Sequence, residues 1–170
     1  ERLTERLRYA IQANSFDSIW SYSQQNDNIV FYLYRGNKMV YWSNAWLNSS
    51  KRIINPVYDQ WYFTRWDNAE GVCYRTQVND FVLVVAIPIK YHYSITSNQL
   101  HNSFIFPFRG DERLKLSTRR SQAAHSVVSR DGTFLFSLEL QEQLNQDGQL
   151  LTMDDALNNF SYQSIFNSDE

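Results

Sequence analysis

The chain has 170 residues, of which 43% are hydrophobic and 16% aromatic, so it can form a sizeable core and is not disordered over most of its length. Its 16 basic and 18 acidic residues nearly balance, and neither sign forms a long block, which excludes an electrostatic nucleic-acid binder. Only 5 Gly and 3 Pro are present, which excludes collagen-like and linker-like chains.

The single cysteine, Cys73, excludes an intrachain disulfide and any metal site that needs several thiolates. The longest apolar run, residues 81–89, has the length of a strand and is far shorter than the ~20 residues of a membrane span. The chain starts at Glu1 without the pattern of a signal peptide. We therefore expect a soluble domain that belongs to a longer protein.

The first two elements are predicted to be helices. Residues 1–13 carry Leu7 and Ile11 at helical spacing among charged residues, which is typical of an amphipathic helix. Ser15 or Asp17 can cap a second helix over residues 18–25.

Strands are predicted from residue 29 onward. β-Branched and aromatic runs, joined by short polar turns, predict a hairpin and then a three-stranded antiparallel meander. The predicted strands are residues 29–34, 39–42, 60–66, 72–78 and 81–88. Because the last of these is apolar on both faces, we expect it in the centre of a sheet and covered on both sides.

The remainder of the chain is more polar. A turn and a short helix around residues 98–102 are followed by residues 109–120, which predict an exposed loop because their apolar residues show little periodicity. Residues 124–129 and 133–140 predict a closing hairpin around Asp131-Gly132. Residues 141–170 are rich in Gln, Asn and Asp and predict a partly ordered segment.

Six short segments, in this order and spacing, resemble the extracytoplasmic sensor domain of two-component histidine kinases from Bacteroidetes. They are FYL at 31–33, MVYWSN at 39–44, WY at 61–62, IPIKYHY at 87–93, NQL at 98–100 and DGTFLFSL at 131–138. The similarity covers about residues 17–140.

The resemblance implies an α+β fold of the PAS-like or Cache-like type, with an antiparallel sheet of about five strands flanked by N-terminal helices. It implies a sensor domain over residues 1–140 and a polar C-terminal segment over residues 141–170. In such proteins the domain lies in the periplasm between two transmembrane helices of an inner-membrane protein. We expect those helices outside this chain, a homodimer in the full-length kinase, and signal transmission through helix packing.

The ligand of such a sensor is a small molecule or an envelope signal of unknown identity. If a ligand site exists, aromatic rings near the hairpin and the meander can line it, and a guanidinium can hold a carboxylate bidentately. The candidate ligand-binding residues are Trp42, Trp61, Arg65, Tyr74 and Arg75. Ordinary core packing is the stronger expectation for most of the aromatic residues.

No enzymatic activity, cofactor or metal site is predicted for this domain. The chain lacks a nucleotide-binding fingerprint and a nucleophile motif, and its three histidines do not have the spacing of metal ligands. Two alternatives stay open: a secreted carbohydrate-binding module that uses exposed Trp and Tyr rings, and a small hydrolase or isomerase that uses His92 or Asp67 in a cavity.

Overall fold

The computed structural model describes residues 2–13, 15, 17–19, 21, 28–45, 47, 58–95, 97, 102–105, 114–120 and 125–140. In chain order the elements are α1 (Arg2–Gln12), β1 (Val30–Arg35), β2 (Lys38–Trp42), β3 (Trp61–Arg65), β4 (Ala69–Val78), β5 (Phe81–Tyr91), β6 (Leu114–Ser117), β7 (His125–Val128) and β8 (Phe134–Leu140). Residues 17–19 and Ser21 are also helical.

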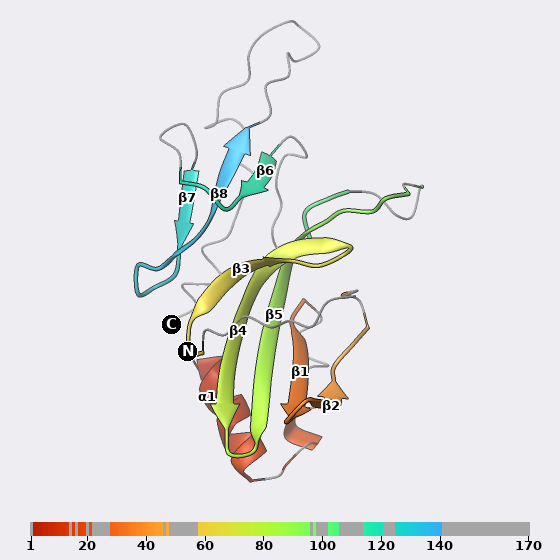
Figure 1. Cartoon of the computed structure of the whole chain (residues 1–170), viewed down its shortest axis with the longest axis vertical. Helices are drawn as coiled ribbons and strands as arrows, with labels where there is room; N and C mark the ends of the chain where they lie inside the picture. The colour runs from red at the N-terminus through yellow and green to blue at the C-terminus, as the bar shows by residue number, and fades with distance from the viewer. Residues whose placement is uncertain are drawn as a thin grey trace, which may run out of the picture.

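Strands β1 to β5 form one antiparallel sheet in the order β2-β1-β5-β4-β3 (Figure 1). The β1–β2 hairpin turns at Gly36, and the β4–β5 hairpin turns at Asn79, both with a positive φ that glycine and asparagine tolerate well. The predicted first hairpin and the predicted meander are thus confirmed.

Strand β5 occupies the middle of this sheet, between β1 and β4. Its residues from Leu83 to Ile89 are all buried, whichever face they point to. The expectation from its uninterrupted apolar sequence, a central strand covered on both sides, is confirmed.

Helix α1 covers one face of the large sheet, which we call the helix face. The buried side chains of Leu7, Ala10 and Ile11 pack there against Phe31, Leu33, Val78, Leu83 and Val85. Phe31 pairs with Val85 and Leu33 pairs with Leu83 across adjacent strands, so an apolar stripe of the helix meets an apolar patch of the sheet.

Strands β6, β7 and β8 form a second antiparallel sheet in the order β6-β8-β7, beyond the ends of β4 and β5 (Figure 1). Its buried residues pack on Val72, Ile87 and Ile89 of the large sheet and form one core with them. The contributing residues of the second sheet are Leu114, Leu116, Val127, Leu135, Phe136 and Leu138.

The predicted fold class is wrong. The expectation was an α+β, PAS-like or Cache-like sheet flanked by N-terminal helices, whereas the described chain is mostly β-structure with two antiparallel sheets and little helix. The physical reason lies after residue 113, where apolar side chains alternate and pair among themselves in a sheet of their own instead of lying in a loop and a lone hairpin.

The exposed loop predicted over residues 109–120 is also wrong where the structure describes it. Leu114 and Leu116 are buried in β6, which pairs with β8, and four residues gave too short a segment for the period-two pattern to be recognised. Residues 98–101 of the predicted short helix, residues 22–25 of the predicted second helix and the whole of segment 141–170 lie outside the described residues. Within the described part, no helix has the length and apolar character that crossing a membrane requires.

Candidate functional site

A polar network on the helix face joins α1 to β4 and to the residue before β3. The Arg8 guanidinium forms an ion pair with Asp59 and donates through Nη2 to Oγ1 of Thr76 at 2.6 Å. Asp59 Oδ1 also accepts from Thr76 Oγ1 at 2.6 Å and from the Tyr74 hydroxyl at 3.2 Å. We call Arg8, Asp59, Tyr74 and Thr76 the Arg8 network.

Backbone geometry holds the carboxylate in this network. Asp59 has a left-handed φ of 58°, and its N–H donates to the carbonyl of Arg75 at 2.7 Å. Hydrogen bonding from Thr76 lowers the pKa of Asp59, with further lowering by Tyr74 and Arg8. Thr76 is fully buried, so its hydroxyl depends on these two partners.

The opposite face of the large sheet carries tyrosines, and we call it the tyrosine face. Strand β4 alternates: Tyr74 and Thr76 point to the helix face, so Cys73 and Arg75 point to the tyrosine face. One buried cluster of this face holds Val30, Tyr32, Leu47, Trp66, Ala69, Cys73, Val84 and Ala86, with Tyr34, Tyr62, Val82 and Tyr91 packed against it. The face is therefore largely closed to solvent, unlike an ordinary polar sheet face.

On the tyrosine face, Nε1 of Trp66, a residue only 4% exposed, is buried without a hydrogen-bond partner. The Tyr62 hydroxyl is also buried, and the group within its reach is the thiol of Cys73. The cross-strand neighbour of Tyr62 is Cys73, whose thiol is a weak hydrogen-bonding group. An unmatched buried donor costs about 1–3 kcal/mol, so such atoms are rare in stable proteins.

The tyrosine hydroxyls and the cysteine thiol of the tyrosine face are held in their neutral forms. Burial raises the pKa of Tyr32, Tyr62 and Cys73, and the proximity of these groups to one another raises the pKa of the two tyrosines further. The Arg75 cation acts in the opposite direction and lowers the pKa of Tyr62. Arg75 also lies over the ring of Tyr58, 4.3 Å from the ring centroid.

The five residues predicted for ligand binding do not come together. Trp61 and Tyr74 are cross-strand neighbours on the helix face, with ring centroids 5.4 Å apart. Trp42 lies opposite Tyr32 on the edge strand β2 and is 54% exposed, and Arg75 is on the tyrosine face. A sugar-stacking platform would therefore have to use Trp42 without Trp61.

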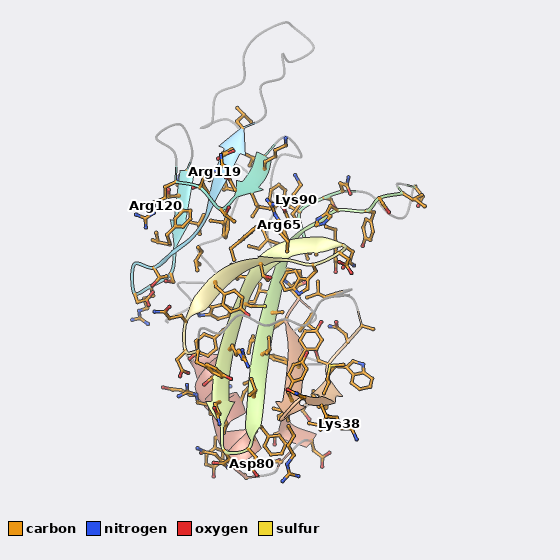
Figure 2. All side chains as sticks on the ribbon, viewed as in Figure 1. Lys38, Arg65, Asp80, Lys90, Arg119 and Arg120 are labelled. Carbon is orange, nitrogen blue, oxygen red and sulfur yellow. The ribbon has the colours of Figure 1, made fainter. Side chains whose placement is uncertain are left out.

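Arg65, the remaining predicted residue, links the two sheets. Its Nε lies 2.6 Å from Glu70 Oε1, and its Nη2 donates to the carbonyl of Leu116 at 3.4 Å. Lys90 Nζ donates to the carbonyl of Leu114 at 2.6 Å. Figure 2 shows Arg65 and Lys90 at the end of the large sheet that meets the second sheet, so both cations bind carbonyls of β6.

Sequence reasoning missed Arg8, Asp59 and Thr76. It counted two further residues among the aromatic rings that can line a sheet face but did not choose them as ligand-binding residues: Tyr62 and Trp66. For the last two a signal exists, because residues 62, 64 and 66 have the period of two that directs side chains to one face. Arg8 and Asp59 are 51 positions apart, and no local pattern indicates that they meet.

In the described part of the chain, no group of three or more His, Cys, Asp or Glu residues could hold a metal ion. Comparison with protein families, curated proteins and solved structures found no match to this chain.

Proposed function

We propose that this chain is the signal-sensing input domain of a membrane-bound two-component histidine kinase. It lies in the periplasm, binds a small molecule or an envelope signal, and changes the activity of a kinase on the other side of the membrane. The proposal is supported by the resemblance of residues 17–140 to such sensor domains and by the position of the Arg8 network.

The observation that carries this proposal is the double role of β4. Successive residues of β4 point to opposite faces of the sheet. Thr76 and Tyr74 contact Arg8 of α1 on the helix face, whereas Cys73 and Arg75 lie on the tyrosine face. A ligand on the tyrosine face that shifts β4 therefore also changes how α1 is held. Such coupling requires only that the ligand binds two arrangements of the domain with different affinity.

Helix α1 is the output element in this proposal. Among the described residues, the Arg8 network adds polar contacts to the apolar ones that hold α1 on the sheet, and the side chains of Arg8 and Asp59 are 41% and 57% exposed. Partly exposed ion pairs contribute little stability, so the network can change its geometry at a small energetic cost. In the full-length dimer, a changed position of α1 would alter the packing of the membrane helices that we expect next to it.

A first experiment reads the coding sequence on either side of residues 1–170. We expect a hydrophobic span upstream, another downstream, and then a phosphoacceptor helix and an ATP-binding region. A gene without a kinase region would refute the proposal.

A second experiment measures autophosphorylation of the full-length kinase in membranes. We expect Arg8→Gln to shift the basal phosphorylation level and to weaken the response to the inducing condition, because it disconnects α1 from β4. Arg35→Gln is the matched control, since it breaks an ion pair with Asp80 that does not involve α1. Equal phosphorylation of the two variants, both folded, would contradict the role of α1.

A further inference from the structure

The hydrogen bonds of the Arg8 network share one acceptor atom, Oδ1 of Asp59. This oxygen accepts from Thr76 Oγ1 at 2.6 Å and from the Tyr74 hydroxyl at 3.2 Å, and it forms the ion pair with Arg8. Nη2 of Arg8 in turn donates to Thr76 and to Tyr74 on β4. The polar contacts that join α1 to β4 therefore depend on the charge of a single carboxylate.

The second oxygen of this carboxylate is open to protonation. In the described part of the chain, the hydrogen bonds and the ion pair of Asp59 all use Oδ1, and the side chain is 57% exposed. A proton from solvent can therefore bind Oδ2 without displacing a contact of Oδ1. Because hydrogen bonds to a charged acceptor are about twice as strong as neutral ones, neutralising the carboxylate weakens all of its contacts together.

The side chains that face Asp59 favour its ionised form. Hydrogen bonding from Thr76 lowers the pKa of Asp59, and Tyr74 from β4 and the Arg8 cation from α1 lower it further. Arg75, the next residue of β4 after Tyr74, points to the tyrosine face. By linkage, contacts that disfavour protonation of a group must themselves be weakened when that group is protonated.

We propose that the Arg8 network is an acid-operated latch, in which a proton on Asp59 loosens α1 from β4 while the sheet stays folded. The inference rests on the proposed sensor function and names acidification as a signal that acts directly on its output helix. Leu7, Ala10 and Ile11 keep their apolar contacts with the sheet, so the helix loosens without leaving it. Since the pKa of Asp59 is lowered from 3.8, the latch is closed above that pH and opens as the pH falls below it.

Hydrogen exchange of the chain of residues 1–170, followed by NMR, tests the latch without any substitution. The measured quantity is the protection factor of each backbone amide, which corrects for the pH dependence of intrinsic exchange. Between neutral pH and a pH below 3.8, we expect the protection of α1 to fall about tenfold and that of the central strand β5 to fall less.

Asp59→Asn keeps the size of the side chain and removes its charge. At neutral pH, we expect α1 of this variant to have the low protection that the wild type reaches in acid, with no further fall on acidification. Asp80→Asn is the matched control, because Asp80 pairs with Arg35 at the tip of the β4–β5 hairpin (Figure 2). It should keep the wild-type protection of α1 and its dependence on pH.

Unchanged protection of α1 in acid, or an equal loss in α1 and β5, would overturn the latch. Wild-type protection of α1 at neutral pH in Asp59→Asn, shown to be folded by circular dichroism, would overturn it as well. These results are obtained on the chain alone and do not depend on a kinase. Failure of the sensor function is judged separately, by the kinase region of the gene and by the phosphorylation phenotype of Arg8→Gln.

Discussion

Thr76 is the buried centre of the Arg8 network. Its hydroxyl donates to Asp59 and accepts from Arg8, both at 2.6 Å, and the residue has no exposed surface. Thr76→Val keeps the shape of the side chain and leaves both partners without this hydroxyl. We expect the free energy of unfolding to fall by about 1–3 kcal/mol, measured by urea unfolding.

Thr64→Val is the control for this change, since Thr64 lies on β3 outside the Arg8 network. It should change the free energy of unfolding by less than Thr76→Val. Equal effects of the two variants would show that the Arg8 network adds nothing to stability.

Cys73 is a structural residue in this fold. It is completely buried, and burial raises the pKa of its thiol, so the reactive thiolate is absent at neutral pH. We expect no labelling by iodoacetamide in the folded protein and full labelling in urea, measured by intact mass. Rapid labelling of the folded protein would show that the tyrosine face opens to solvent.

Strand β6 is held by its neighbour and by side chains from the other sheet. It pairs with β8 on one side, and Lys90 and Arg65 bind the carbonyls of Leu114 and Leu116. Binding of edge carbonyls by cations satisfies acceptors that a lone edge strand leaves open. These two side chains therefore connect the sheets in addition to their shared apolar core.

Lys90→Met tests this connection because it keeps most of the apolar stem and removes the ammonium group. We expect faster hydrogen exchange at the backbone amides of β6 and β8, measured by mass spectrometry or NMR, with the Arg8 network unaffected. Lys115→Met is the matched control, since Lys115 is exposed on β6 itself. Unchanged exchange in Lys90→Met would mean that the apolar core alone holds β6.

At the scale of the whole molecule, two carboxyl groups make the free energy of unfolding depend on pH. They are Asp59 in the Arg8 network and Asp131 in the turn between β7 and β8. The pKa of Asp59 is lowered chiefly by its hydrogen bond from Thr76, and that of Asp131 chiefly by its hydrogen bond from Ser129. A carboxyl group with a lowered pKa in the folded state contributes stability above its unfolded value of 3.8. That contribution is lost as the pH falls below 3.8 through the lower folded value.

We therefore expect the free energy of unfolding to be nearly constant above this window and to decline within it, measured by urea unfolding at a series of pH values. Asp59→Asn and Asp131→Asn should each make the decline shallower. A decline of the same steepness in both variants would assign it to other groups.

The molecule as a whole presents two different faces of one sheet. The helix face is closed by α1 and by the second sheet, and the tyrosine face holds small residues, rings and hydrogen-bond donors. Because strand side chains alternate, β4 presents side chains to both faces. In the proposed sensor, this arrangement lets a ligand on one face influence a helix on the other.

Local patterns predicted much of the large sheet. The hairpin around Gly36, the meander of β3 to β5 and the central position of β5 were all predicted, because period-two alternation and turn residues act over a few neighbouring positions. The same local logic predicts an exposed loop for the four residues of β6, and that prediction is wrong.

The sequence by itself determined the strands of the large sheet and their turns, a net charge of only -2 and the presence of a single cysteine. Only the tertiary structure decided that the last strands form a second sheet, that Arg8 meets Asp59 across 51 positions, and that Trp61 and Trp42 point to opposite faces. The physical reason is range: turns and alternation are set by adjacent residues, whereas the partners of a side chain depend on strand register and sheet packing, which involve the whole chain at once.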